Sequence, residues 1–230
     1  MPKGGILKKP QTRLSGAASA IVPKRSARAR RPRRIVTVSG RGARGYVPMR
    51  KAALAQFESL VELKALQALE VAPSVKSITT QPRVFEYTEG ARRRRYTPDV
   101  EIEVEIGAGI EAVFLEVKDD ERFTPGSEAA ERIQAALPYL RQQGERLHIV
   151  LRSDLIANEF DRELALLLGQ RPRRIRFRTD INAALWDPEM GTLPSADIQR
   201  RWEDAKRQCD ELLRRIMNRD PDDLLPVSTR

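Results

Sequence analysis

Residues 98–118, PDVEIEVEIGAGIEAVFLEVK, contain two runs of alternating apolar and charged residues separated by a glycine-containing turn. Alternation with a period of two is typical of β-strands with one buried face, so the runs predict an antiparallel hairpin. One face is aliphatic: Val100, Ile102, Val104, Val113, Leu115 and Val117. The other face is mostly charged: Asp99, Glu101, Glu103, Glu105, Phe114, Glu116 and Lys118.

The length of the turn decides which residues of the hairpin face one another. A loop of residues 107 and 108 pairs Ile106 with Gly109 and places Asp99 opposite Glu116. A four-residue loop keeps the two carboxylates on one face but diagonal, whereas a three-residue loop without a bulge puts them on opposite faces. The apolar pattern therefore predicts that Asp99 and Glu116 are neighbours, with Lys118 beside them.

Two adjacent carboxylates repel unless a cation lies between them, and Lys118 alone neutralises one charge. Mg²⁺ prefers oxygen ligands and usually binds one or two carboxylates together with water and substrate phosphate. Asp99, Glu116 and the backbone carbonyl of Val117 suit half of such a shell, with Mn²⁺ as a substitute metal. Lys118 would then orient or help deprotonate an attacking water and offset charge on a scissile phosphate. The pattern predicts a phosphodiesterase site.

Composition excludes several other kinds of site. Cys209 is the only cysteine and His148 the only histidine, so disulfide frameworks, cysteine zinc sites and Ser-His or Cys-His catalysis are excluded. We interpret His148 as structural. No apolar run reaches the roughly 18 residues that span a bilayer, and the basic N-terminus lacks the apolar core of a signal peptide. We expect a soluble, cytoplasmic protein without a membrane partner.

The basic residues are concentrated near the N-terminus. Residues 1–57 hold 15 Lys and Arg and no acid, so the rest of the chain holds 27 basic against 32 acidic residues. Residues 1–48 predict a largely disordered arm whose natural partner is a polyanion, although basic tails also occur on ribosomal, capsid-binding and imported proteins. The arginine cluster of this arm is our candidate for DNA contacts: Arg30, Arg31, Arg33 and Arg34.

Residues 50–71 have apolar residues at helical spacing and predict an amphipathic helix. Glu62 shares one face of it with Ser59, Leu66 and Leu69. A carboxylate that faces inward usually has a partner, a metal being one choice, and the alternative is a surface charge that pairs with Lys64 or another neighbour.

Residues 82–88 and 92–106 predict two strands that precede the strand at 110–118, giving three consecutive antiparallel strands. In this arrangement Glu86 pairs with Arg93 and Val84 with Arg95. Arg95, with no acid opposite, is a candidate phosphate ligand. Gln81 is either a residue that positions a metal-bound water or phosphate, or a plain strand-entry residue.

The remaining pattern predicts a helix at 127–144, a strand at 146–153, a helix at 154–169, a strand or basic edge at 173–179 and a long helix at 195–218. We divide the chain into the arm, an α/β nuclease domain at 49–152 and a mostly helical extension at 153–230. The long helix carries an apolar stripe that suits either intramolecular packing or docking to a partner: Ile198, Trp202, Ala205, Cys209, Leu212 and Ile216.

These residues resemble a known family. The Pro-Asp followed by Glu-Val-Lys is similar to the PD-(D/E)xK nuclease core, and the layout of residues 50–152 resembles the TnsA endonuclease subunit of heteromeric bacterial transposases. The residues that carry the resemblance are Ser59, Glu62, Val75, Gln81-Pro82, Tyr96-Thr97-Pro98-Asp99 and Glu116-Val117-Lys118. It implies a restriction-endonuclease-like α/β fold with a mixed sheet flanked by helices.

The resemblance also implies an active site of Glu62, Asp99, Glu116 and Lys118, in which Glu62 joins Asp99, Glu116 and Val117 around the metal. It implies cleavage of double-stranded DNA at the 5′ ends of a mobile element, in a bacterial, nucleoid-associated setting. The implied partners are a DDE-type transposase that acts on the 3′ ends and an AAA+ ATPase regulator. Two alternatives stay open, namely a stand-alone restriction or repair nuclease and a non-catalytic DNA-binding assembly protein.

Overall fold

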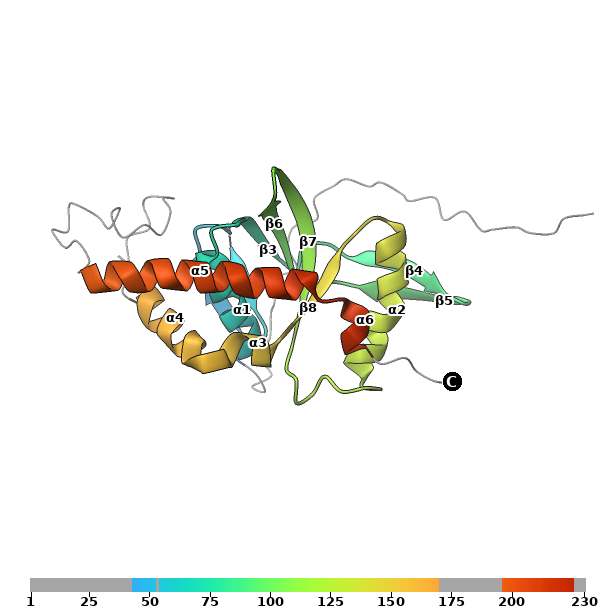
Figure 1. Ribbon diagram of the computed structural model, residues 1–230. Coiled ribbons are helices and arrows are strands. Elements are labelled where there is room, and N and C mark those ends of the chain that lie inside the picture. The colour runs from blue at the N-terminus through green and yellow to red at the C-terminus, as the bar shows by residue number, and fades with distance from the viewer. Residues whose placement is uncertain (1–42, 53, 170–195, 226–230) are drawn as a thin grey trace, which may run out of the picture. The chain divides into compact units, whose positions relative to one another are not determined.

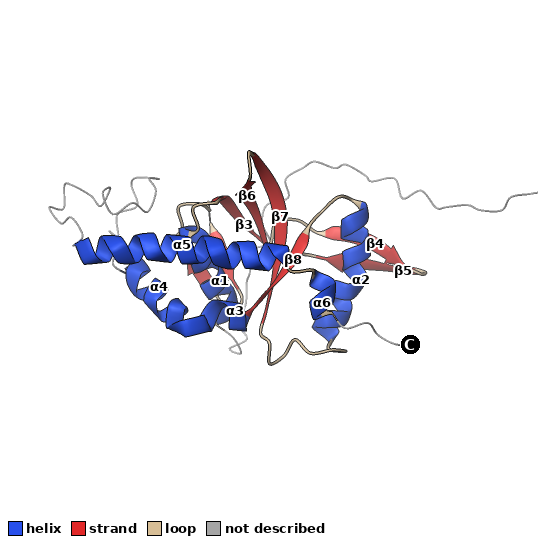
Figure 2. Ribbon diagram, viewed as in Figure 1, coloured by secondary structure: helices blue, strands red, loops and turns tan. Residues whose placement is uncertain are grey.

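The computed structural model describes residues 43–52, 54–169 and 196–225, and its centre is a mixed four-stranded sheet (Figures 1 and 2). The strand order is β3-β6-β7-β8, in which β3, β6 and β7 are antiparallel and β8 runs parallel to β7. The strands are β3 (Val75–Thr80), β6 (Val100–Ile106), β7 (Gly109–Lys118) and β8 (Leu147–Leu151). The predicted hairpin, the strand expected at 146–153 and the mixed α/β architecture are thus confirmed.

The β6–β7 hairpin has the shortest of the three loops considered, the loop of two residues. Ile106 pairs with Gly109 and Val100 with Leu115, so Gly107 and Ala108 form the turn. Gly107 has a φ of 60°, a left-handed conformation that glycine adopts without steric cost. This register places Asp99, one residue before β6, next to the end of β7.

The three consecutive antiparallel strands are a wrong prediction. The expected second strand is two strands, because Pro98 has no N–H to donate to a ladder and lies between β5 (Arg92–Tyr96) and β6. β5 pairs with β4 (Phe85–Glu89) in a separate two-stranded sheet. On the side away from β7, β6 pairs with β3 instead.

The expected register of that second hairpin is also wrong. Glu86 pairs with Arg95 and Thr88 with Arg93, because the turn is Gly90–Ala91 rather than Glu89–Gly90. Gly90 has a φ of 59°, which again suits glycine.

The first helix is shorter than expected. α1 spans Leu60–Val71, and Ser59 caps it by accepting a hydrogen bond from the backbone N–H of Glu62. The preceding residues form β2 (Ala55–Phe57), which pairs with β1 (Gly45–Val47). β1 lies inside residues 1–48, the segment that we assigned to the basic arm. Backbone pairing and the Ser59 cap outweigh the helical spacing of residues 50–58.

The other helices follow the predicted order, but the single helix expected at 154–169 is wrong, because the backbone at Ala157 leaves the helical region with a ψ of 131° and divides the segment. α2 (Glu128–Gln142) connects β7 to β8 and continues through Pro138. Then come α3 (Arg152–Ile156), the 3₁₀ turn η1 (Ala157–Glu159), α4 (Phe160–Gly169), α5 (Ala196–Asn218) and α6 (Pro221–Leu224). The strand or basic edge expected at 173–179 lies outside the described residues. No helix in the described part of the chain is long and apolar enough to cross a membrane.

The two faces of the sheet pack into separate hydrophobic clusters. Val113, Leu115 and Val117 of β7 pack with α1 and α5, whereas Phe114 packs with α2 and the β4–β5 hairpin. α5 contacts α1, α4 and β8, as Figure 1 shows. Its predicted stripe is buried from Trp202 to Ile216, so this face packs within the protein and is covered.

Candidate active site

Asp99 and the end of β7 meet at one edge of the sheet. Oδ2 of Asp99 accepts hydrogen bonds from the backbone N–H of Val117 at 2.9 Å and from Nζ of Lys118 at 3.3 Å. Nζ of Lys118 lies 2.7 Å from Oε1 of Glu116. The predicted neighbourhood of Asp99, Glu116 and Lys118 is therefore present.

The ammonium group of Lys118 lies within a cradle of three oxygens. It contacts Asp99 Oδ2, Glu116 Oε1 and, at 3.1 Å, the backbone carbonyl oxygen of Val117. Burial acts to lower the pKa of Lys118, but the carboxylates of Glu116 and Asp99 outweigh it and leave the pKa raised. Lys118 is thus a cation held by the same three groups that the sequence predicts as metal ligands.

Glu116 is fully buried, and two further residues compensate it. The hydroxyl of Tyr96 donates a 2.7 Å hydrogen bond to Oε2, and Nη2 of Arg132 from α2 lies 3.5 Å from Oε1. Burial and the neighbouring charge of Asp99 raise the pKa of Glu116. Neither Tyr96 nor Arg132 was among the predicted site residues.

Glu62 lies in the first turn of α1, where its carboxylate accepts hydrogen bonds from the N–H of Glu58 at 2.8 Å and the hydroxyl of Ser59 at 3.1 Å. Burial, followed by repulsion from Asp99, raises the pKa of Glu62 to about 7. Lys64 pairs with Asp161 at 2.5 Å, so the alternative pairing with Glu62 is wrong. Glu62 is thus a half-buried carboxylate whose pKa is raised in part by the charge of Asp99.

The oxygen atoms of these carboxylates and of the Val117 carbonyl are chemically suited to a divalent cation. In residues 43–52, 54–169 and 196–225, no three Asp, Glu, His or Cys side chains already form a metal-binding group. The Lys118 ammonium, however, is a stand-in ion that shows how three oxygens converge on one cation. The raised pKa values of Glu62 and Glu116 mark crowded negative charge that a metal would relieve. Metal ligation by Glu62, Asp99, Glu116 and Val117 stays a prediction.

The structure gives a separate outcome for each of the predicted DNA contacts. Arg95 has an acid opposite it, because Glu86 lies 3.1 Å from its guanidinium and also pairs with Arg93 at 2.7 Å. The reason given for Arg95 as a phosphate ligand is therefore wrong. Gln81 donates its backbone N–H to the carbonyl of Asp99 at 2.9 Å, so it lies beside the site. The arginines of the arm, Arg30, Arg31, Arg33 and Arg34, lie outside the described residues.

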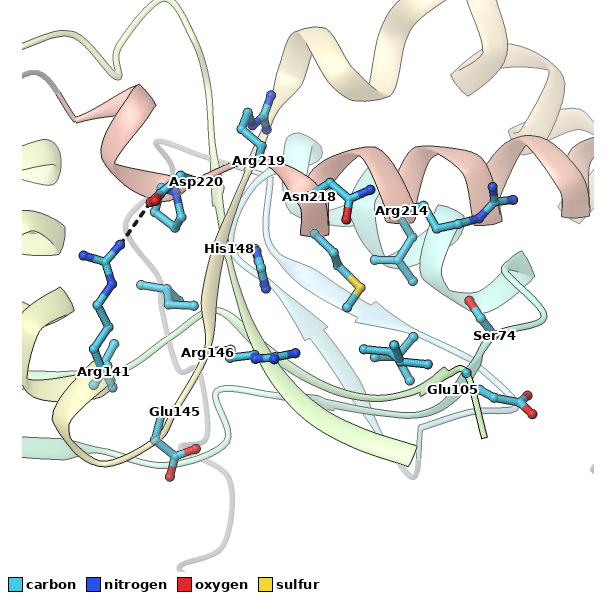
Figure 3. Close-up of a pocket in the computed structure, with 18 of the residues that line it drawn as sticks. Ser74, Glu105, Arg141, Glu145, Arg146, His148, Arg214, Asn218, Arg219 and Asp220 are labelled. Atoms are coloured by element: carbon cyan, nitrogen blue, oxygen red, sulfur yellow. Dashed lines mark hydrogen bonds and ion pairs between the residues drawn. The ribbon is translucent and has the colours of Figure 1, made fainter. Parts of the chain in front are cut away.

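A cavity of about 680 Å³ opens at the other end of the sheet (Figure 3). It is lined by the tip of the β6–β7 hairpin, the start of β8 and the end of α5, and it includes none of the predicted catalytic residues. His148 lies in this cavity, and burial lowers the pKa of its ring. His148 is the only histidine of the sequence, so no histidine takes part in the chemistry at Asp99.

The fold and site define a class: a restriction-endonuclease-like α/β core with the PD-(D/E)xK arrangement of acid, acid and lysine at the ends of two paired strands. Residues 72–152 match the family model described as TnsA-like endonuclease N terminal. This segment is a TnsA-like endonuclease N-terminal domain. The matched segment contains Asp99, Glu116 and Lys118, whereas Glu62 lies before it. No curated protein matched the chain.

Proposed function

We propose that the chain is a metal-dependent DNA endonuclease that acts as a transposase subunit and hydrolyses phosphodiester bonds at the 5′ ends of a mobile element. The observation that carries this proposal is the convergence of Asp99, Glu116 and Lys118 within a TnsA-like endonuclease domain. Double-stranded DNA is the proposed substrate, and a DDE-type transposase and an AAA+ ATPase are the proposed partners.

Asp99, Glu116, the Val117 carbonyl and Glu62 would hold Mg²⁺ or Mn²⁺, and the bound ion would polarise the scissile phosphate and acidify water. Lys118 has a raised pKa, so at neutral pH it is an ammonium that donates hydrogen bonds. In this form it would orient the attacking water and offset charge on the phosphate. Tyr96 holds the Glu116 carboxylate in place.

The test is cleavage of supercoiled plasmid that carries candidate element ends, in Mg²⁺ or Mn²⁺, with and without a transposase encoded beside this chain. Native protein is compared with Asp99→Ala and Lys118→Ala. We expect cutting that depends on the partner and on the metal and is lost in both variants.

Other outcomes identify the alternatives. Strong site-specific cleavage by the isolated chain would favour a stand-alone restriction or repair nuclease. DNA binding without cleavage under every condition would favour a non-catalytic assembly protein and would overturn the proposal.

A further inference from the structure

We propose that Arg132 of α2 binds the scissile phosphate of the DNA and stabilises the negative charge that grows on it during hydrolysis. This inference rests on the proposed nuclease function. Nη2 of Arg132 lies 3.5 Å from Oε1 of Glu116, the oxygen that also contacts Lys118. Arg132 therefore reaches the catalytic cluster from the crossover helix.

Of the two cations at Glu116, only Arg132 is open to solvent. The side chain of Lys118 is 17% exposed and its Nζ already contacts three oxygens, whereas the side chain of Arg132 is 53% exposed. A guanidinium carries five N–H donors. Arg132 makes no hydrogen bond to any residue that the structure describes, and apart from Nη2, which lies near Glu116, its donors are available to a ligand.

The negative charge of the site favours a cation at the place where the phosphate approaches. Glu62, Asp99 and Glu116 bring three carboxyl groups to a place where a DNA phosphate must approach, and Lys118 is enclosed among them. The planar fork of an arginine matches two oxygens of a phosphate group. Arg132 is placed to attract the phosphate to the edge of this acidic cluster.

A purely structural role explains Arg132 less well. Its Nη2 lies 3.5 Å from Oε1 of Glu116, whereas Nζ of Lys118 lies 2.7 Å from the same oxygen, so Lys118 is the main partner of this carboxylate and much of the Arg132 side chain faces solvent. Other arginines have closer acidic partners: Arg93 and Arg95 pair with Glu86, and Arg141 pairs with Asp220 and Asp222. Arg141 is on the same helix and is 48% exposed, so it is a matched control.

The first arm of the test measures single-turnover cleavage by the full chain with its transposase, after the native cut has been mapped. We expect Arg132→Ala to lower the rate about 10²–10³-fold and Arg132→Lys to recover only part of it. A neutral methylphosphonate at the scissile position should slow the native protein more than it slows Arg132→Ala, because both changes remove one contact. Losses that simply multiply would overturn the proposal.

The second arm measures binding of duplex DNA by fluorescence anisotropy at several KCl concentrations. Loss of one phosphate contact should reduce the slope of log K against log[KCl] by about 0.9 in Arg132→Ala. Arg141→Ala should keep the native slope, and thermal melting of both variants checks that they are folded.

The two arms separate this inference from the proposed function. If the native protein cuts DNA but Arg132→Ala shows neither the coupling nor the change in slope, the assignment of Arg132 fails and the nuclease stands. If no DNA is cut but the slope changes, the nuclease function fails and the phosphate contact stands. If no DNA is cut and the slope does not change, both the nuclease function and the assignment of Arg132 fail.

Discussion

The hydroxyl of Tyr96 donates a 2.7 Å hydrogen bond to Oε2 of Glu116, and both side chains are buried, with 2% and 0% of their surface exposed. The bond leaves Oε1 facing Lys118 and Arg132. Tyr96 ends β5, and Asp99 follows three residues later, so one short segment places both the hydroxyl and the first carboxylate against the end of β7. Tyr96 is a positioning residue for Glu116.

Tyr96→Phe removes this donor and keeps the ring. Because partners that orient a metal ligand contribute to affinity, we expect Mn²⁺ binding to weaken about 10–100-fold. The buried oxygen that loses its partner should cost about 1–3 kcal/mol of unfolding free energy. Electron paramagnetic resonance titration of Mn²⁺ and urea unfolding measure the two effects. Tyr87→Phe on the same hairpin is the control, and native Mn²⁺ affinity in Tyr96→Phe would contradict the assigned role.

Removal of Lys118 should destabilise the fold as well as abolish cleavage. Lys118→Met leaves the buried Glu116 carboxylate without its nearest cation, which should cost about 3 kcal/mol. Adding Glu116→Gln removes the uncompensated charge, so the double variant should regain much of the lost stability. Chemical denaturation of both variants at neutral pH measures this, and equal stability of Lys118→Met and the native chain would show that the pair is not buried as described.

Glu62 should make stability depend on pH. Its pKa is raised from 4.5 to about 7 by burial and by Asp99, so the folded state binds a proton more tightly than the unfolded state. The associated stability is fully present below about pH 4.5 and is lost as the pH rises through 7. The change should amount to about 1–3 kcal/mol.

The measurement for Glu62 is urea unfolding between pH 4.5 and pH 8 with EDTA present. Glu62→Gln cannot titrate, so the difference in stability between this variant and the native chain should shift in favour of the variant as the pH rises. Parallel pH profiles for the two proteins would refute the raised pKa.

Replacement of Trp202 should destabilise the described structure as a whole. Trp202 is 0% exposed and lies in the cluster that contains α1 and the sheet. Trp202→Ala should cost about 3–5 kcal/mol. Arg207→Ala, an exposed change on the same helix, should cost less than about 0.5 kcal/mol in thermal or urea unfolding. A native-like Trp202→Ala would instead support α5 as a detachable partner-binding helix.

The sequence alone determined the β6–β7 hairpin. Aliphatic residues alternate with acids along β6, and one residue of slip would turn those acids toward the aliphatic core, so the register is strongly specified. Asp99, Glu116 and Lys118 came together for this reason. The strand β8 also followed from its local pattern, whereas only the second part of the helix expected at 154–169 is the continuous helix α4.

Only the tertiary structure decided what lies on either side of that hairpin. A register shift between Val75 and Ser77 breaks the period of two in β3, so its sequence does not read as a strand. Pro98 separated β5 from β6, and the Ser59 cap set the start of α1. Local alternation cannot reveal a bulge or the choice of a strand partner.

Arg132 and Tyr96 show the same limit within the site. Arg132 reaches Glu116 only because α2 crosses over the sheet between two parallel strands, and Tyr96 reaches it because β5 bends away at Thr97-Pro98. Periodicity reports which face of its own strand or helix a residue occupies. Contacts between side chains on different elements depend on packing across the sheet, and this is decided by the folded chain as a whole.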